Sequence, residues 1–405
     1  MNISEQVTTL MQGTEYGDET LKQAMANELG QRLTEAHEEN RPLRVYCGYD
    51  PRTTDIHLGH TITMRKLRQF QELGHEVTFL IGTYTSLIGD PSDKDKLRPR
   101  LTPEEVEENA RTYAEQAYKI LDREKTIIRY NAEWLSKLTF ADLIKIASNF
   151  TIQQFLTREN FKLRWEQSDP IYLHETFYAL MQGYDAYAMR SDVQVGGTDQ
   201  LFNIVTAARK IMTYFGEKPN IAIIMGILPG TDGIIRMSKS LGNHIPVMAP
   251  ANDMYGKVMS LPDQAMGDYA RLVTRWSPKE IKEFDEGLTT GRVHPRDAKM
   301  KIAREIVEIF RNPEEAAQAE TAFIRVFQKQ KLPEDMPTYT LQPGQTVLDV
   351  LQAGGLVNSR GEGRRLITQN GIRLDGETLN QSNQPFPHPG VLQAGKRRFL
   401  RVTEN

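Results

Sequence analysis

The sequence predicts an α/β protein with a doubly wound parallel sheet, followed by a helical domain and a small α+β domain. Short apolar runs at 44–47 and 76–82 flank an amphipathic segment at 61–73, which is the pattern of a βαβ unit. The pattern from 252 to 328 is almost wholly helical. Short apolar runs with glycine-rich turns then follow a polar segment at 332–340.

The N-terminal 40 residues are expected to form amphipathic helices on the outside of the sheet. Leu21, Met25, Leu29 and Leu33 recur every four positions, before an Arg-Pro pair breaks the pattern. The other elements of the sheet domain are expected as a helix at 103–122, a strand at 126–130, a helical region to about 187, a strand at 193–195, a helix at 201–214 and a strand at 221–225.

We expect four parts along the 405 residues. They are a domain at 1–246 with N-terminal helices and an inserted helical region, a helical domain at 247–331, a linker at 332–340 and a small domain at 341–405.

Composition indicates a globular protein of a reducing compartment. Cys47 is the only cysteine, so no disulfide framework within the chain is possible. The acidic N-terminus lacks the pattern of a secretory signal, and no run approaches the roughly 20 apolar residues of a membrane span. We therefore expect a cytoplasmic protein without membrane contact.

The net charge of −3 is unevenly distributed. Residues 341–405 carry eight basic and five acidic side chains, which gives +3 there and −6 in the rest of the chain. The C-terminal part is therefore the candidate surface for a polyanion.

The run VYCGYDPRTTDIHLGH at 45–60 passes from a strand through a turn to a helix N-terminus. Unpaired N–H groups and the helix dipole make such a place attractive to phosphate. His57 and His60 would share one helical face and both can donate to phosphate oxygens, and Gly59 would admit a flat purine ring. Such a pair also fits surface histidines or a metal site, but no cysteine or carboxylate at helical spacing completes a zinc site.

A second motif is the loop GIIRMSKSLGN at 233–243. Arg236 and Lys239 lie between two glycines, where cations can close over a triphosphate and oppose the charge on departing pyrophosphate. A basic loop of this kind is often only a solvated turn. Together, however, HLGH and RMSKS resemble the HIGH and KMSKS signatures of class I aminoacyl-tRNA synthetases.

Four further segments resemble the active-site segments of bacterial-type tyrosyl-tRNA synthetases: YCGYDP at 46–51, LIGDPS at 87–92, YALMQGYD at 178–185 and QVGGTDQ at 194–200. This resemblance implies an enzyme that activates tyrosine with ATP and transfers it to tRNA. It implies that 1–246 is the catalytic, nucleotide-binding domain, that 247–331 is a helical tRNA-binding domain and that 341–405 is a small RNA-binding domain. It also implies Mg²⁺ held by ATP without a dedicated protein site, and a homodimer formed through the catalytic domain.

Tyr178, Gln182 and Asp185 recur at i, i+4 and i+7 and therefore share one helical face. In the family, Tyr46 and Asp185 would contact the phenolic hydroxyl of the substrate. Asp90, Tyr178, Gln182 and Gln200 would hold its α-ammonium group. A carboxylate that accepts from a phenol in a dry pocket penalises phenylalanine, which leaves it unpaired. The implied tyrosine-binding set is Tyr46, Asp90, Tyr178, Gln182, Asp185 and Gln200.

The resemblance also implies the chemistry. The tyrosine carboxylate attacks the α-phosphate, pyrophosphate leaves, and catalysis comes from positioning and charge stabilisation. Two departures from the family pattern are Arg236, which replaces the first lysine of the second signature, and Arg52, which stands where many relatives carry threonine. The implied phosphate contacts are His57, His60, Lys94, Arg98, Arg236 and Lys239. The implied ATP-binding set is Gly48, Asp50, His57, Gly59, His60, Gly197, Asp199, Met237 and Lys239.

In the last domain, SRGEGRRLITQNGIRLDGE at 359–377 resembles a small RNA-binding domain first described in a ribosomal small-subunit protein. Its helix would bring two arginines to phosphates, and a basic run near the C-terminus would extend the surface. A basic domain of this kind is often only a solubility feature. The expected RNA-binding residues are Arg364, Arg365, Lys396, Arg397 and Arg398.

Two alternative hypotheses stay open at this stage. The first is a related enzyme of the same fold, such as a tryptophanyl-tRNA synthetase or another adenylating enzyme. The second is a non-catalytic RNA-binding protein on a synthetase scaffold. Amino-acid-dependent pyrophosphate exchange would distinguish these three functions.

Overall fold

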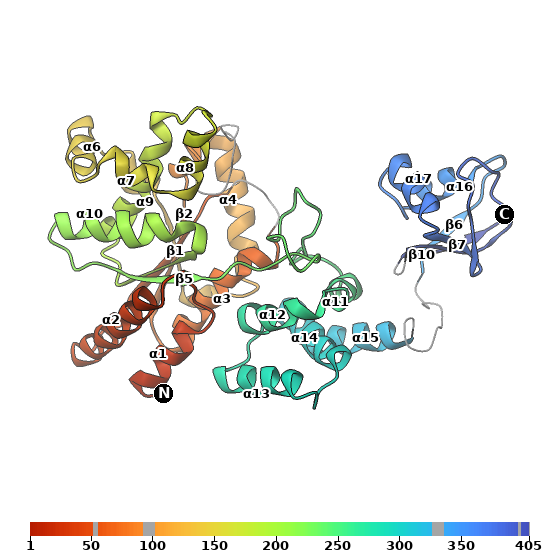
Figure 1. The fold of residues 1–405 in the computed structure, drawn as a ribbon, viewed down its shortest axis with the longest axis horizontal. Helices are drawn as coiled ribbons and strands as arrows, with labels where there is room; N and C mark the ends of the chain where they lie inside the picture. The colour runs from red at the N-terminus through yellow and green to blue at the C-terminus, as the bar shows by residue number, and fades with distance from the viewer. Residues whose placement is uncertain (52–55, 92–101, 326–335, 396–397, 405) are drawn as a thin grey trace. The chain divides into compact units, whose positions relative to one another are not determined.

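A five-stranded parallel sheet with the order β3-β2-β1-β4-β5 organises the first part of the chain in the computed structural model (Figure 1). Strand β1 pairs in parallel with both β2 and β4, so the chain changes direction across the sheet at β1 and β4. The predicted doubly wound parallel sheet is therefore confirmed, and this switch point is where such sheets bind ligands. The strands are β1 (Arg44–Tyr49), β2 (Glu76–Ile81), β3 (Thr126–Tyr130), β4 (Val193–Gly197) and β5 (Ile221–Met225).

The structure describes every residue except 52–55, 92–101, 326–335, 396–397 and 405. The described residues form two compact units, Met1–Ala316 and Ala317–Asn405. Several residues with expected roles lie outside the described part of the chain, namely Arg52, Lys94, Arg98, Lys396 and Arg397.

Strands β4 and β5 are buried on both faces, as their continuous apolar runs predict. All residues of β5 are buried, and so are the first four of β4. Tyr46 and Leu80 pack against Ala186 and Met212, which belong to helices on one face of the sheet. The helices up to β5 are α1 (Ile3–Met11), α2 (Glu19–Glu38), α3 (Leu58–Glu72), α4 (Pro103–Ala117), α5 (Ala132–Leu135), α6 (Phe140–Ala147), α7 (Ile152–Leu156), α8 (Glu159–Glu166), α9 (Leu173–Ala188) and α10 (Arg209–Tyr214).

The helix expected at 201–214 is not a single α-helix. A 3₁₀ turn over Thr198–Gln200 leads into a π-helical segment, Phe202–Ala208, and only then into α10. Helical turns of the wider π type are rare in proteins, and those that occur are often found at functional sites. Here the segment carries Asn203, whose contacts are described below.

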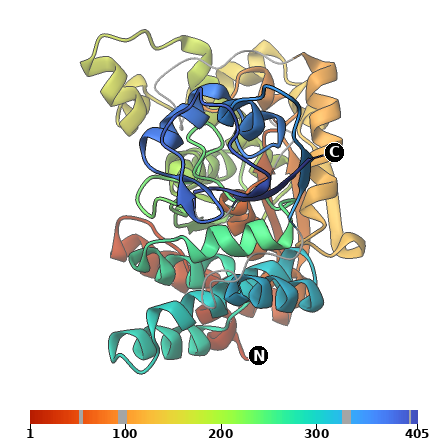
Figure 2. The same cartoon turned by 90° about the vertical axis from the view of Figure 1, so that its right-hand side faces the viewer.

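The segment after α1 covers the outer edge of β5. Glu15 N–H donates to Ile224 O over 2.8 Å, and Gly226 N–H donates to Gly13 O over 3.1 Å. These bonds satisfy backbone groups that an edge strand would otherwise expose. The N-terminal segment also lies beside the helices that follow β5, because Gln12 Nε2 donates to Trp276 O over 3.4 Å (Figure 2).

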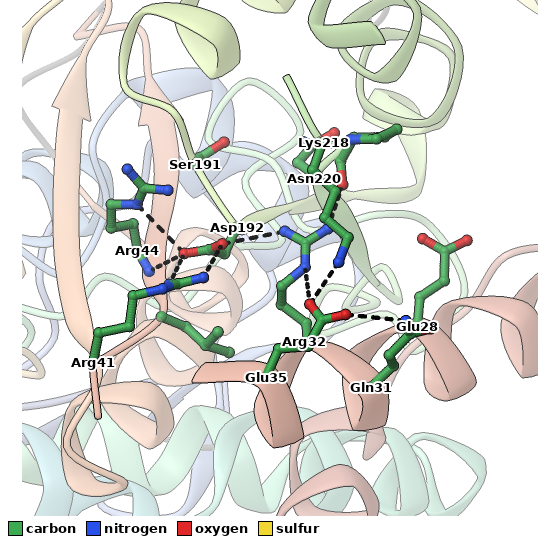
Figure 3. A network of polar contacts seen from close by, with 12 residues as sticks. Glu28, Gln31, Arg32, Glu35, Arg41, Arg44, Ser191, Asp192, Lys218 and Asn220 are labelled. Carbon is green, nitrogen blue, oxygen red and sulfur yellow. Dashed lines mark hydrogen bonds and ion pairs between the residues drawn. The ribbon is translucent and has the colours of Figure 1, made fainter. Parts of the chain in front are cut away.

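A dense ionic network holds the amino ends of β1 and β4 (Figure 3). The Asp192 carboxylate accepts from Arg32 Nη1 over 3.2 Å and from Arg41 Nη1 over 2.9 Å. It also accepts from the backbone N–H of Arg44 over 2.9 Å. Helix α2, which carries Arg32, is thereby fastened to the sheet.

A helical region follows β5. Arg65 on α3 donates from Nη2 to Thr274 O over 2.7 Å, which joins this region to the sheet. Among the described residues, every helix is too short or too polar to span a lipid bilayer. The helices of this region are α11 (Ala251–Met259), α12 (Met266–Val273), α13 (Pro278–Thr289), α14 (Pro295–Phe310) and α15 (Pro313–Phe323).

The second unit contains a five-stranded mixed sheet with the order β6-β10-β9-β7-β8. Val347, Leu351 and Ile367 on its helices pack with Leu392 and Leu400 on the sheet in one apolar core. Its elements are β6 (Thr338–Thr340), α16 (Val347–Ala353), α17 (Arg360–Thr368), β7 (Ile372–Leu374), β8 (Glu377–Thr378), β9 (Gly390–Ala394) and β10 (Arg398–Thr403).

The small sheet begins inside the range expected to be a linker. Residues 332–335 of that range lie outside the described part, whereas Thr338–Thr340 pair with Arg401–Thr403 as β6. Pairing with a strand some sixty residues away gives no local sequence signal, so the polar, proline-containing pattern concealed this strand. The finer division of the chain into four parts stays a proposal.

Candidate active site

A cavity of about 690 Å³ opens at the carboxyl ends of β1 and β4. Both sequence motifs contribute to its lining, together with residues from α9 and from the turn after β4. Tyr46 is the one described member of the expected tyrosine and ATP sets that does not line this cavity. The expected site residues that line it are Gly48, Asp50, His57, Gly59, His60, Asp90, Tyr178, Gln182, Asp185, Gly197, Asp199, Gln200, Arg236, Met237 and Lys239.

The HLGH motif forms the start of α3, which begins three residues earlier than expected. His57 is the N-cap of α3 and has an extended backbone conformation. The next residue, Leu58, donates its N–H to Ile245 O over 3.0 Å. Burial lowers the pKa of His57 to about 2, with further lowering by the neighbouring His60 and His244. His57 is therefore neutral and offers a single N–H donor.

His60 occupies the first turn of the same helix, with its ring centroid 3.8 Å from that of His57. Its Nδ1 accepts from His57 N–H over 3.3 Å. In a neutral ring this arrangement leaves the proton on Nε2, so His60 can donate from that atom. The helix N-terminus and two imidazoles thus provide donors suited to an anion.

The chain just after the RMSKS loop pairs with the backbone at the start of the HLGH motif. Val247 N–H donates to Ile56 O over 3.0 Å, and His57 and Pro246 form an antiparallel bridge. A Cβ at position 59 would lie 3.0 Å from His57 Cε1 and 3.6 Å from Met237 Cβ. Gly59 therefore permits close contact between the two motifs. That they act together on one ligand stays a prediction.

The opposite side of the cavity contains a buried carboxylate with neutral donors. Trp134 Nε1 donates to Asp185 over 2.7 Å, and Asn131 Nδ2 donates to it over 3.3 Å. Burial raises the pKa of Asp185 to about 8, although these two hydrogen bonds act in the lowering direction. A carboxyl group that accepts from neutral donors can also pair with a neutral hydroxyl.

The phenol of Tyr46 lies near this carboxyl group. The side chain is 1% exposed, and its hydroxyl has no hydrogen-bond partner among the described residues. Burial, reinforced by the charge of Asp185, raises the pKa of Tyr46 well above its ordinary value. Buried hydroxyls are nearly always paired, so an unpaired one is unusual. Because Tyr46 does not line the cavity, its part in ligand binding stays a prediction.

A polar network lies between these two sides. Gln200 Nε2 donates to Asp90 over 2.5 Å, and Asn203 Nδ2 donates to the side-chain oxygens of both Gln200 and Gln182 over 2.9 Å. The amides are thereby held with defined orientations. Their oxygens and the Asp90 carboxylate form an acceptor group suited to an ammonium ion.

Tyr178 extends this network toward β1. Its hydroxyl donates to Asp50 Oδ2 over 3.0 Å, while Thr85 Oγ1 donates to Asp50 Oδ1 over 2.8 Å. The predicted helical face is confirmed, because Tyr178, Gln182 and Asp185 all reach the cavity from α9.

The lone cysteine also lines the cavity but offers no nucleophile. Burial raises the pKa of the Cys47 thiol to about 12, so the thiolate is not formed near neutral pH. Among the described residues, no group of three or more histidine, cysteine, aspartate or glutamate side chains is arranged to hold a metal ion.

Sequence reasoning missed Asn131, Trp134, Thr85 and Asn203. Asn131 and Trp134 directly follow β3, and residues at the carboxyl end of a parallel strand are candidates for a site. That rule could have found them. Asn203 had no such signal, because its position depends on the π-helical turn.

Basic side chains of the second unit lie on and beside α17. Arg364 and Arg365 are exposed, as are Arg373 and Arg401. Arg398 donates instead to Glu362 over 2.8 Å, which balances its charge. Two of the exposed arginines, Arg364 and Arg365, lie on α17 and define what we call the α17 surface.

Comparison with known proteins identifies the family. The family described as tRNA synthetases class I (W and Y) matches residues 38–328. The chain is 46% identical over 378 residues to the tyrosine-tRNA ligase of Moorella thermoacetica, covering 93% of this chain and 91% of the relative. It is 46% identical to the tyrosine-tRNA ligase of Haemophilus influenzae, covering 92% and 93%.

Among solved structures, a C-terminally truncated mitochondrial tyrosyl-tRNA synthetase from Aspergillus nidulans is similar in fold. Its TM-score is 0.60 at 24% identity, and the match covers 75% of this chain and 89% of that one. The resemblance to bacterial-type tyrosyl-tRNA synthetases, drawn from HLGH, RMSKS and the four further segments, is confirmed. The chain belongs to the class I tRNA synthetases of the W and Y family.

Proposed function

We infer that this chain is a tyrosine-tRNA ligase, an aminoacyl-tRNA synthetase that activates tyrosine with ATP and esterifies it to tRNA. The observation that carries this inference is one cavity with two chemically different sides. A buried Asp185 with neutral donors lies on one side, and the HLGH helix start lies on the other beside the basic loop. The first suits a phenol and the second suits a triphosphate.

In the proposed reaction the tyrosine carboxylate attacks the α-phosphate of ATP. The bond from the α-phosphorus to the bridging oxygen breaks, and pyrophosphate leaves with that oxygen. The ribose hydroxyl at the 3′-end of tRNA then attacks the tyrosyl carbonyl and releases AMP. No side chain forms a covalent bond, so catalysis depends on positioning and on charge stabilisation at the phosphates.

We assign the residues to three roles. The phenol is held by Tyr46 and Asp185, and the α-ammonium group by Asp90, Tyr178, Gln182 and Gln200. The nucleotide contacts backbone at the glycines of the cavity and the side chains of Asp50 and Asp199. The phosphate contacts are His57, His60, Arg236 and Lys239, with Lys94 and Arg98 from the part of the chain outside the description.

Mg²⁺ is proposed to arrive with ATP. This ion prefers oxygen ligands and keeps several waters, so phosphate oxygens and water molecules can supply most of its ligands. No side chain of this chain is assigned to it. When bound, the ion would reduce the negative charge on the departing pyrophosphate.

The proposal is tested by ATP–pyrophosphate exchange with tyrosine, phenylalanine and tryptophan. We expect exchange that depends on tyrosine and is weak with the other two. Preference for tryptophan would favour the related synthetase, and no exchange with any amino acid would favour a non-catalytic RNA-binding protein.

We further propose that the chain forms a homodimer through helices α6 to α9, which group together in Figure 1. Seven large apolar side chains of the described part are exposed there, and exposed apolar surface of this kind is found at protein interfaces. They are Phe140, Ile144, Ile152, Leu163, Trp165, Tyr172 and Leu173. Sedimentation of Ile152→Lys, from a site that is 70% exposed, should yield monomers where the wild type sediments as a dimer. A monomeric wild type would contradict the proposal.

We propose that residues 341–405 hold tRNA through the α17 surface. A chain that ends at residue 331 should exchange pyrophosphate at close to the full-length rate and bind tRNA more weakly. The affinity falls with salt by a slope of about −0.9 per neutralised phosphate on duplex, so the shortened chain should have a shallower slope. Equal affinities and slopes would exclude RNA contact by this region.

A further inference from the structure

The RMSKS loop is closed by the side chain of Asn243, which is only 7% exposed. Its Nδ2 approaches Ile235 O at 3.3 Å and Arg236 O at 3.2 Å, and its Oδ1 accepts from Ser238 N–H over 2.8 Å. One carboxamide therefore bonds to backbone on both sides of Met237. It can do so because a carboxamide offers both a hydrogen-bond donor and an acceptor.

Asp232, at the other end of the loop, holds this carboxamide. Its Oδ2 accepts from Asn243 Nδ2 over 2.5 Å. Its Oδ1 accepts from the backbone N–H groups of Ile234 and Ile235 over 2.8 and 2.6 Å. These hydrogen bonds, with that from Asn243 the largest, hold the pKa of Asp232 below its ordinary value, so it is ionised near neutral pH.

The backbone of Gly230 and Thr231 packs closely against Asn243. Thr231 N–H donates to Asn243 O over 2.8 Å. A Cβ at Gly230 would lie 2.2 Å from Asn243 Nδ2, so glycine is required there for the carboxamide to enter. The bonds together form a clasp, which we define as the side chains of Asp232 and Asn243 with the loop backbone that they bind.

We propose that Asn243, held by Asp232, is a positioning residue that sets the loop conformation in which Arg236 and Lys239 line the cavity. Neither member of the clasp is among the described residues that line the cavity. The clasp therefore acts through the loop backbone on the activation step and leaves tyrosine binding alone. This inference rests on the proposed function of the loop as a phosphate site.

The test uses Asn243→Asp, which keeps the shape and the acceptor for Ser238 N–H but loses the Nδ2 donor and faces Asp232 with a like charge. Asp232→Asn alone keeps the acceptor for the loop N–H groups. The double variant restores a donor to the pair and removes the repulsion. Asn252→Asp, at an exposed residue of α11, is the matched control for the same chemical change.

We expect Asn243→Asp to slow single-turnover adenylate formation by about 100-fold, since small misplacements of substrate-positioning groups have effects of that size. Equilibrium dialysis without ATP should give tyrosine affinity within about twofold of the wild type, because the tyrosine contacts are untouched. The double variant should recover about tenfold of the lost rate. The control should match the wild type.

A second readout does not depend on activity. Trypsin cleavage of the folded protein after Arg236 and Lys239 should be about tenfold faster in Asn243→Asp, because an opened loop is a better substrate. If the wild type exchanges no pyrophosphate, the proposed function fails, and this cleavage rate still tests the clasp. Unchanged activation and cleavage in Asn243→Asp, or a parallel loss of tyrosine affinity, would overturn the proposal.

Discussion

Two buried aspartates near the two ends of the same helix–strand connection have opposite environments. Asp185 on α9 is 2% exposed and accepts from the neutral donors of Trp134 and Asn131. Asp192, just before β4, is 3% exposed and accepts from three arginines. Burial raises the pKa of Asp185 to about 8, whereas the hydrogen bonds and charges around Asp192 hold its pKa below the ordinary value despite the burial.

The difference separates a binding carboxylate from a structural one. Asp192 is saturated by cations and backbone, so it fastens α2 to the sheet and has nothing left for a ligand (Figure 3). Asp185 lacks a cation and lies near a Tyr46 hydroxyl that has no partner among the described residues. Burial of its charged form costs free energy, and a phenol that enters the cavity can donate a hydrogen bond that offsets part of this cost. Residue type and burial are therefore insufficient to identify function, and the charge of the neighbours decides it.

The largest effect expected from a substitution is on stability at Asp192. Asp192→Asn removes the buried counter-charge of Arg32 and leaves only the longer pair with Glu35, at 3.7 Å, among the described residues. We therefore expect the free energy of unfolding to fall by about 3–5 kcal/mol. Urea unfolding measures this. Asp253→Asn, which removes a surface pair with Lys257, should change the same quantity by less than about 1 kcal/mol. Equal effects at the two positions would remove the structural role of Asp192.

The second prediction concerns the pH dependence of stability. The folded pKa of Asp185 exceeds its unfolded value, so between pH 4 and 8 the folded state binds more protons and the free energy of unfolding falls as pH rises. The decline should be on the order of 5 kcal/mol, at about 1.4 kcal/mol for each pKa unit, and should be absent in Asp185→Asn. Asp192 has a lowered pKa, so its contribution is present above the unfolded pKa and is lost as pH falls below it. A slope unaffected by Asp185→Asn would contradict this reading.

The third prediction concerns the phosphate side of the cavity. Lys239→Ala should slow adenylate formation by about 100-fold while tyrosine affinity and the free energy of unfolding stay nearly constant. Lys279→Ala, at a side chain that is 87% exposed, is the control. Single-turnover kinetics separates the steps. A proportional loss of tyrosine affinity would make Lys239 a ground-state binder.

The smallest expected effect is at a neighbour of Asp185. Trp134→Phe removes the Nε1–H donor, which acts to lower the pKa of Asp185, and so should raise that pKa further. The lost hydrogen bond corresponds to about 1 kcal/mol, or roughly fivefold in kcat/KM for tyrosine. Trp276→Phe, which changes an indole packed against Phe284, should leave kcat/KM unchanged. Similar losses in both variants would assign the effect to packing.

Much of the fold was predictable because its signals are local. The strands at 126–130 and 221–225 have the predicted bounds, and the face of Tyr178, Gln182 and Asp185 follows from helical spacing. The Asp192 network was not predictable, since its arginines lie 148 to 160 residues earlier in the chain. The same limit explains why β6 was missed, whereas the partners of Asp185 follow β3 and could have been found from that position. Tertiary pairing of distant polar groups leaves no periodic pattern in a single sequence.

The most direct test of the account is the ratio of kcat/KM for tyrosine to that for phenylalanine in pyrophosphate exchange. It should be measured in the wild type, in Asp185→Asn and in Asp192→Asn, well below the unfolding temperature of each. The account predicts that Asp185→Asn lowers this ratio by about 100-fold, because a hydrogen bond to a buried carboxylate is lost, and that Asp192→Asn leaves it unchanged. An unchanged ratio in Asp185→Asn, or an equal fall in both variants, would contradict the account.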